Sequence, residues 1–277
     1  MNCVNFHLTI DYVGSSGIVL TPEQKAALQT SLTILKSEQK FFKVNFWGSL
    51  KGNKGDYYIA QGIGKDEMYE KRTIYSKDCM NWNILPAYTE EHKNLSKFFK
   101  ERFTGDPSNE FEYINYIEKT DDKGETIEEE EILRLKEEDR LSVLVDEIDK
   151  EVFIVPRGAY VRLPTGQIVS NRLYEGLPAI DSLKLSSYLH FRQPYALPLK
   201  TLMERARYDK AIDFLDPIEE DIPKISWSLQ LDRGTGLVIL KSLVWPGYVF
   251  YQIPDHKAFG SVYFGYGERN IDLPFMI

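Results

Sequence analysis

Residues 237–277 read LVILKSLVWPGYVFYQIPDHKAFGSVYFGYGERNIDLPFMI, and this stretch decides the fold class. Its apolar segments LVILKSLVW, YVFYQIP and SVYFGYG are separated by proline and glycine, which mark turns between strands. Eight aromatic rings fall within about twenty residues here, and such rings fit the pleated, half-buried surface of a sheet. The stretch therefore predicts successive short strands at the end of the chain.

Gly265 and Gly267 raise the question of a phosphate-binding loop. A dinucleotide fingerprint needs a third glycine and a helix that opens directly after the first strand. The segment Gly-Tyr-Gly-Glu-Arg-Asn has neither the third glycine nor a following helical pattern. We therefore predict a bulge or a close backbone approach within a sheet at these two glycines.

The rest of the chain mixes helices with hairpins. Turn residues between residues 43–52 and 56–64 predict one hairpin, and Pro164, Thr165 and Gly166 predict the reversal of another. Thr21 and Pro22 are typical of a helix start. Short strands are predicted at residues 4–13, at 72–76 and at 81–88, and helices at 22–39, 89–103, 135–151, 180–193 and 200–214. This pattern favours an α+β fold with a mainly antiparallel β-sheet, hairpins and several packed helices.

We predict one domain over residues 1–277, with an acidic insertion or loop around residues 118–131. Between Glu118 and Glu151 there are 15 acidic and 6 basic residues, whereas the whole chain has a net charge of −8. The second part of this segment places Leu141, Leu144, Val145 and Ile148 on one helical face with acids opposite. We interpret the acids as a solvated face, with a docking surface for a basic partner as the alternative.

The sequence has no motif that commits it to a reaction, so we predict a protein that is not an enzyme and has no cofactor. No GxSxG, HExxH or P-loop pattern occurs, and the two cysteines and four histidines lack the spacing of metal ligands. His190 is predicted to be structural, at a helix end. A pI near 5.2 argues against nucleic acid and anionic membranes as partners. The sequence contains no apolar run of about 18 residues, so we predict no membrane span. The N-terminal residues predict no secretory signal and hence a cytosolic location.

The last forty residues carry more aromatic rings than one sheet face needs, and SVYFGYG is apolar on both sides. Such a strand is either central in its sheet or covered by something else, and an edge strand could also pair with a partner's strand. Tyrosine and tryptophan anchor many protein interfaces. Our candidate interface residues, each with a core role as the alternative, are Trp245, Tyr248, Phe250, Tyr263 and Tyr266.

Seven blocks lie in order along nearly the whole chain: FWG (46–48), DYYIAQG (56–62), VPRGAY (155–160), SSYLHFRQP (186–194), DIPKISWSLQLDRG (221–234), SLVWPG (242–247) and GERNIDLPFM (267–276). These blocks resemble the radial spoke head protein 9 family of motile cilia and flagella. WPG and the FG…YFGYG ending are also similar to the larger spoke head proteins 4 and 6.

This resemblance implies a non-catalytic scaffold in the axoneme, the cytoskeletal core of the cilium. It implies assembly with spoke head proteins of the 4/6 family and other spoke head subunits, and indirect contact with central pair projections. The head would then relay mechanical signals from the central pair to dynein and support motility. A small-molecule-binding or enzymatic domain with an unrecognised cleft, and an adaptor that works outside the axoneme, are the alternatives.

Overall fold

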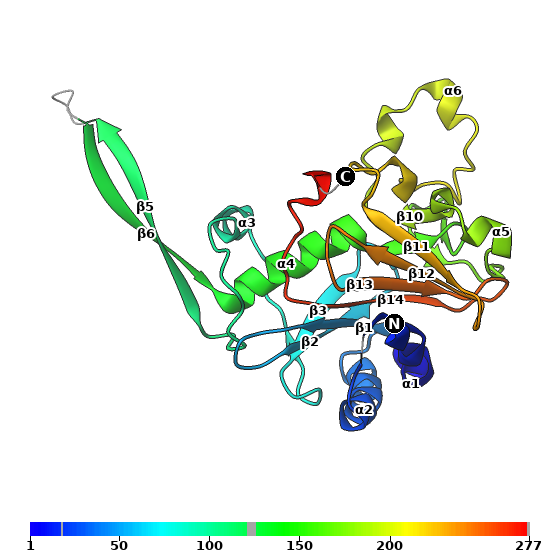
Figure 1. Cartoon of the computed structure of the whole chain (residues 1–277), viewed down its shortest axis with the longest axis horizontal. Helices are drawn as coiled ribbons and strands as arrows, with labels where there is room; N and C mark the ends of the chain where they lie inside the picture. The colour runs from blue at the N-terminus through cyan, green and yellow to red at the C-terminus, as the bar shows by residue number, and fades with distance from the viewer. Residues whose placement is uncertain (18, 121–125, 276–277) are drawn as a thin grey trace.

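A mixed sheet of eight strands, in the order β11-β12-β13-β14-β1-β2-β3-β4, forms the centre of the molecule (Figure 1). The computed structural model describes residues 1–17, 19–120 and 126–275. Every neighbouring pair in this sheet is antiparallel except β1 and β14, so the predicted α+β class with a mainly antiparallel sheet is confirmed. The strands are β1 Lys43–Leu50, β2 Tyr57–Ile63, β3 Lys71–Ser76, β4 Asn83–Ile84, β11 Trp227–Asp232, β12 Leu237–Ser242, β13 Tyr248–Gln252 and β14 Phe259–Gly265.

The parallel pair β1–β14 joins strands from the two ends of the sequence. Gly48 lies opposite Tyr263, and the register of β1 against β2 shifts between Phe46 and Gly48. The strand SVYFGYG is therefore central in its sheet, and the suggestion that it forms an open edge is wrong. It is apolar on both sides because both faces of the sheet are covered by other parts of the same chain.

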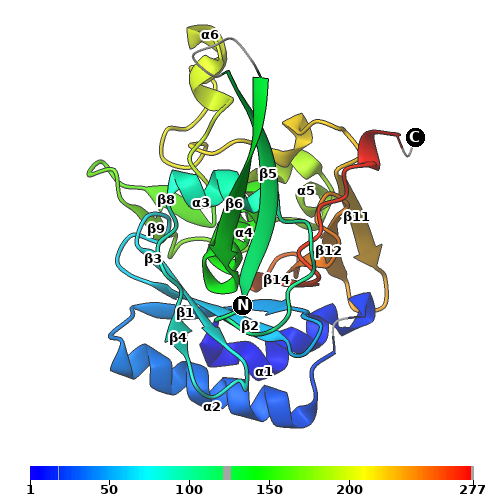
Figure 2. The same cartoon turned by 90° about the vertical axis from the view of Figure 1, so that its left-hand side faces the viewer.

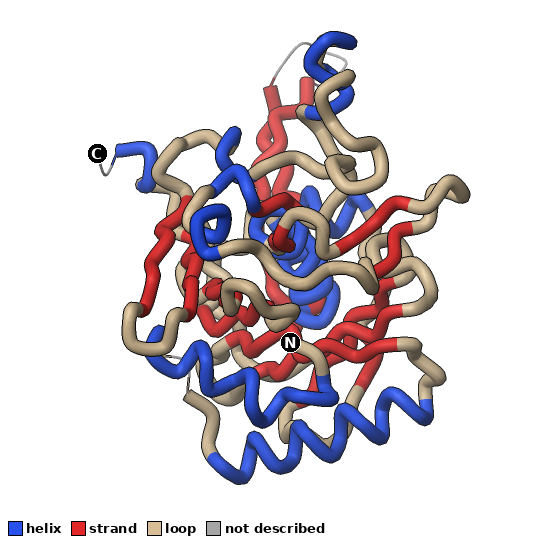
Figure 3. The backbone as a smooth tube through the Cα atoms, turned by 90° about the vertical axis from the view of Figure 1, so that its right-hand side faces the viewer, coloured by secondary structure: helices blue, strands red, loops and turns tan. Residues whose placement is uncertain are grey.

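The N-terminal segment covers one face of the sheet (Figures 2 and 3). It contains a 3-10 helix (Cys3–Asn5), α1 (Phe6–Thr9), a second 3-10 helix (Ile10–Ser16) and α2 (Pro22–Glu38). The strand predicted at residues 4–13 is wrong, because Phe6, Ile10 and Val13 are buried at helical spacing. Val4 and Leu8, which completed the alternating pattern, are exposed.

Helix α2 confirms the predicted start signals. The Thr21 hydroxyl accepts the Gln24 backbone N–H, and the Gln24 side chain accepts the Thr21 backbone N–H, which makes a capping box. The leucines at 28, 32 and 35 are buried against the sheet.

Helix α4 (Glu137–Val152) covers the opposite face, together with the two-stranded sheet of β7 (Ile154–Pro156) and β10 (Tyr188–His190). Leu141, Val145 and Ile148 are buried there and Leu144 packs against them, so the predicted apolar face is confirmed. Aromatic rings from the sheet fill the space below the helix. Both faces of the sheet are thus covered.

The acids of α4 do not form the solvated face that the sequence suggested. Glu137 is fully buried and accepts the Tyr57 hydroxyl at 2.8 Å. Asp149 accepts the Trp47 indole N–H at 2.6 Å, and Glu151 accepts the Trp245 indole N–H at 2.7 Å. Burial, and then the bond to Glu137, raises the pKa of Tyr57 far above its usual value. Helical periodicity places Glu137 on the same face as Leu141 and Leu144, but it could not show that ring donors on or beside the sheet would reach these acids.

Strands β5 (Glu110–Thr120) and β6 (Thr126–Lys136) form a hairpin that projects away from the body (Figure 1). Near its base, after α3 (Glu90–Ser96), Phe98 stacks on Tyr113 with ring centroids 5.4 Å apart. The predicted acidic insertion around residues 118–131 falls on the outer part of this hairpin, and its residues 121–125 lie outside the described residues. The single-domain organisation stays a prediction.

Residues 180–214 differ most from the sequence-based prediction. Only α5 (Ala179–Ser182) and α6 (Leu202–Arg205) are α-helical, so the two long helices predicted there are wrong. The backbone of β10 pairs with β7 instead, with Tyr188 opposite Pro156 and His190 opposite Ile154. Upstream, β8 (Tyr160–Arg162) and β9 (Ile168–Ser170) confirm the predicted reversal.

Replacing Gly48 by alanine should destabilise the fold by about 2–4 kcal/mol, because Gly48 has a φ of +147° and an added Cβ would lie 1.9 Å from the Tyr263 carbonyl oxygen. Urea unfolding followed by tryptophan fluorescence measures the change. Gly14→Ala is the matched control, since an added Cβ there meets nothing within 4 Å. Equal midpoints for Gly48→Ala and the unmodified chain would contradict the tight β1–β14 contact.

Candidate protein interface

Four of the five candidate interface rings lie inside the core. Trp245, Tyr248, Phe250 and Tyr263 are at most 4% exposed and pack in the cluster below α4. The Tyr248 hydroxyl accepts the Ile154 backbone N–H at 3.2 Å, and the Tyr263 hydroxyl accepts the Gly267 backbone N–H at 2.9 Å. Burial raises the pKa of Tyr263 to about 12. These side chains thus have little surface to offer to a partner.

Tyr266 is different, because its side chain is 45% exposed. The Arg102 guanidinium lies 4.6 Å from the centre of its ring and the Lys51 ammonium 5.5 Å, and both are cation–π contacts. Arg102 also forms an ion pair with Glu268 at 2.9 Å. Tyr266 is therefore an exposed ring held between two cations.

The two glycines that flank Tyr266 are tightly packed. Gly267 has a φ of +74°, and an added Cβ would lie 2.5 Å from Leu144. A Cβ at Gly265 would lie 2.4 Å from the Tyr263 hydroxyl. The predicted close backbone approach is confirmed at Gly265, where an added Cβ would lie 2.7 Å from the Pro246 carbonyl oxygen, whereas Gly267 lies after β14 and packs against side chains.

The segment 195–212, which we name the apolar lobe, exposes large side chains that the sequence interpretation did not select. Leu199, Leu202 and Met203 are 86%, 78% and 81% exposed. The available signal was the spacing of these three residues, which places them on one side of a helical turn. A cluster of exposed apolar side chains on an ordered loop is typical of a contact surface.

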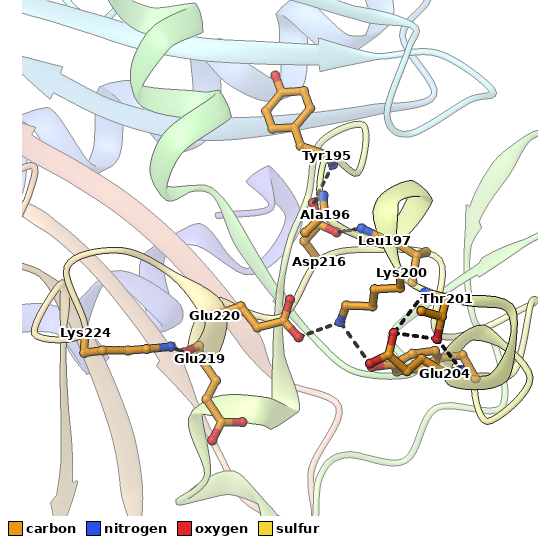
Figure 4. Close-up of polar contacts among 11 residues, drawn as sticks. Tyr195, Ala196, Leu197, Lys200, Thr201, Glu204, Asp216, Glu219, Glu220 and Lys224 are labelled. Carbon is orange, nitrogen blue, oxygen red and sulfur yellow. Dashed lines mark hydrogen bonds and ion pairs between the residues drawn. The ribbon is translucent and has the colours of Figure 1, made fainter.

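Polar contacts fix the base of the apolar lobe (Figure 4). The buried Asp216 carboxylate accepts three backbone N–H groups, from Tyr195 at 2.6 Å, Ala196 at 3.1 Å and Leu197 at 2.8 Å. Lys200 bonds to Glu220 and, at 3.2 Å, to the Tyr208 hydroxyl.

The far end of the lobe is tied to the body as well. Arg157 forms a two-point ion pair with the buried Asp213, with distances of 2.5 and 2.7 Å. Thr201 and Glu204 form a capping box at the start of α6. With both ends held in this way, the apolar tip is presented in one orientation.

His190 lies in β10 and not at a helix end. It is 2% exposed, and its Nε2 lies 2.8 Å from Asp221, which also accepts the Trp227 indole N–H at 2.7 Å. The arrangement links β10 to β11 through one carboxylate. Over residues 1–17, 19–120 and 126–275, no group of three or more His, Cys, Asp or Glu is placed to hold a metal ion. No helix in the described ranges is long and apolar enough to cross a bilayer.

Comparison with known proteins gives the family. The family described as radial spokehead-like protein matches residues 2–141. Curated relatives named radial spoke head protein 9 homolog are 45% identical in Bos taurus, 45% in Homo sapiens and 42% in Danio rerio, each over all of both chains. The chain belongs to the radial spokehead-like family. The resemblance noted in the sequence is thereby confirmed.

Replacing Asp216 by alanine should loosen the apolar lobe while the sheet stays folded, because three backbone N–H groups lose their acceptor. Trypsin should then cleave after Arg205 and Arg207 at a higher rate. The rate should rise about tenfold if the substitution lowers the free energy of local unfolding of the lobe by about 1.4 kcal/mol. Glu219→Ala, an exposed acid nearby, is the control. Unchanged cleavage in the Asp216 variant would show that this carboxylate does not hold the lobe.

Proposed function

We propose that this chain is a non-catalytic structural subunit of the radial spoke head, located in the axoneme of motile cilia or flagella. The observation that carries the proposal is similarity over the full length to radial spoke head protein 9 homologs. A head built from such subunits would transmit mechanical signals from the central pair toward dynein.

The use of polar side chains supports a structural role. Glu137, Asp149 and Glu151 accept hydrogen bonds from rings of the sheet, and Asp216 and Asp221 accept bonds from neighbouring loops and strands. These carboxylates are committed to holding elements together. A subunit that transmits force needs such internal hydrogen bonds, because a loosely packed domain would deform instead of moving the neighbouring subunits. No observation among the described residues favours a small-molecule or catalytic role.

The proposed partners are spoke head proteins of the 4/6 family and other head subunits, with the central pair reached indirectly. Two surfaces support a protein contact: the apolar lobe with Leu199, Leu202 and Met203, and the exposed ring of Tyr266. Burying one large apolar side chain at an interface contributes about 1.5–3 kcal/mol, so the lobe alone could supply much of a contact.

The double variant Leu202→Glu/Met203→Glu should lose co-elution with a spoke head protein of the 4/6 family from the same organism. Both side chains are largely exposed, so the fold should be unaffected while two charges enter the proposed contact. Size-exclusion chromatography with light scattering measures the complex. Ile34→Glu, on the exposed side of α2, is the matched control. If the double variant still co-elutes, the lobe is not the contact; if the unmodified chain does not co-elute, the proposed partner is wrong.

Two single variants, Tyr266→Glu and Tyr263→Glu, distinguish a ring in the proposed interface from a ring in the core. Tyr263→Glu should lower the free energy of unfolding by more than about 3 kcal/mol, because it buries a charge in the core. Tyr266→Glu should fold normally by circular dichroism and weaken the complex. A folded Tyr266 variant with full binding would remove Tyr266 from the interface.

A further inference from the structure

A groove runs between the segment after α3, the outer side of α4 and the chain after β14. It has a volume of about 550 Å³. Eight basic and five acidic side chains line it, in a protein whose net charge is −8. Trp245, Leu144 and Tyr266 add apolar surface to its walls. We name it the basic groove.

Ion pairs within the basic groove cancel most of its acids. Three pairs join its own walls: Arg102–Glu268, Lys150–Asp146 and Arg269–Glu151. Lys93 lies 4.0 Å from Glu90. Lys97, Lys100, Arg140 and Arg192 form no ion pair with a carboxylate in the described parts of the chain, and the unpaired acids of the lining are Glu101 and Glu147. Burial lowers the pKa of Arg140, and the nearby carboxylates of Glu137 and Glu101 offset part of this effect. The groove thus keeps an excess of positive charge.

Arg140 is the most constrained of these cations. It is 9% exposed, and its guanidinium lies over Phe103 and Phe111, 4.6 and 4.8 Å from the ring centres. Its Nη2 donates to the Glu101 carbonyl oxygen, but its buried Nη1 has no acceptor among the described residues. Leaving a buried charged donor without an acceptor costs about 1–3 kcal/mol or more. A carboxylate in the groove would face the charge of this guanidinium, while the buried Nη1 itself is not exposed to the groove.

Arg192 repeats the pattern on another part of the lining. Its guanidinium stacks on Tyr195 at 4.5 Å, and its buried Nε finds no acceptor in the part of the chain that the structure describes. Two buried arginine nitrogens without acceptors therefore occur on residues that line the same groove. Guanidinium groups of this kind suit the two oxygens of a carboxylate.

We infer that the basic groove binds an acidic segment of another protein chain, with carboxylates on Arg140 and Arg192 and further acids near Lys97 and Lys100. A segment fits better than a single anion, because the free cations come from three separate parts of the chain and apolar walls lie among them. The inference concerns a surface separate from the tip of the apolar lobe and does not depend on which complex the protein joins.

Fluorescence anisotropy with a labelled hexaglutamate peptide tests this on the full chain at low salt. The unmodified protein should bind hexaglutamate and not hexaglutamine. Lys97→Glu/Lys100→Glu and, separately, Arg192→Gln should each weaken binding about tenfold, the loss of a charge-assisted contact. Lys77→Glu, exposed and outside the groove, should bind like the unmodified protein.

A conservative substitution is used at Arg140, because its guanidinium packs on two aromatic rings. Arg140→Lys keeps the positive charge but loses the planar set of guanidinium donors, so it should weaken peptide binding. The melting temperature of the variant shows whether the fold is intact. Equal binding by the groove variants and Lys77→Glu, or by the two peptides, would overturn the inference. Competition by inorganic phosphate as strong per molecule as by unlabelled hexaglutamate would show a simple anion site instead.

Discussion

The parallel contact between β1 and β14 is the constraint on which the rest of the structure depends. It joins strands that are more than 200 residues apart and so turns two antiparallel ribbons into one sheet of eight strands. Gly48 permits it, because any side chain there would collide with the backbone at Tyr263. The continuous sheet has two wide apolar faces, one covered by the N-terminal helices and the other by α4. The positions of the hairpin, the apolar lobe and the basic groove follow from the positions of these helices.

Carboxylates of α4 fix how that helix lies on the sheet. Apolar packing alone is non-directional and would tolerate a helix that slides or rotates. Three bonds spread along the helix and fix its placement: Tyr57 donates to Glu137, Trp47 donates to Asp149, and Trp245 donates to Glu151. Each charge-assisted bond contributes about 1.5–3 kcal/mol net, and loss of one partner leaves a buried group unpaired. Directional bonds at three points therefore hold the helix in one position on the sheet.

The sequence predicts what local pattern controls and misses what depends on distant neighbours. The β1–β2 hairpin and α2 follow from turn residues, capping and spacing within a few residues. Residues 4–13 fit both a strand and a helix period, and only the covering sheet decides between them. The rings chosen for an interface are abundant at the end of the chain because β14 is covered on both faces, which composition could not show. Leu199 and Met203 look like core residues in sequence, but both are exposed. The chain on either side of them is held by backbone bonds to the carboxylates of Asp216 and Asp213, which sequence spacing does not reveal.

The apolar lobe and the basic groove meet at one short segment. Arg192 lines the groove and stacks on Tyr195, whose backbone N–H is held by Asp216 at the base of the lobe. The two surfaces suit partners of different chemistry, an apolar one and an acidic one, so they need not compete. Only two residues lie between Arg192 and Tyr195, so a carboxylate bound at Arg192 would act close to the base of the lobe. The proposed groove contact and the proposed lobe contact are thus connected by a few residues that are held by fixed bonds.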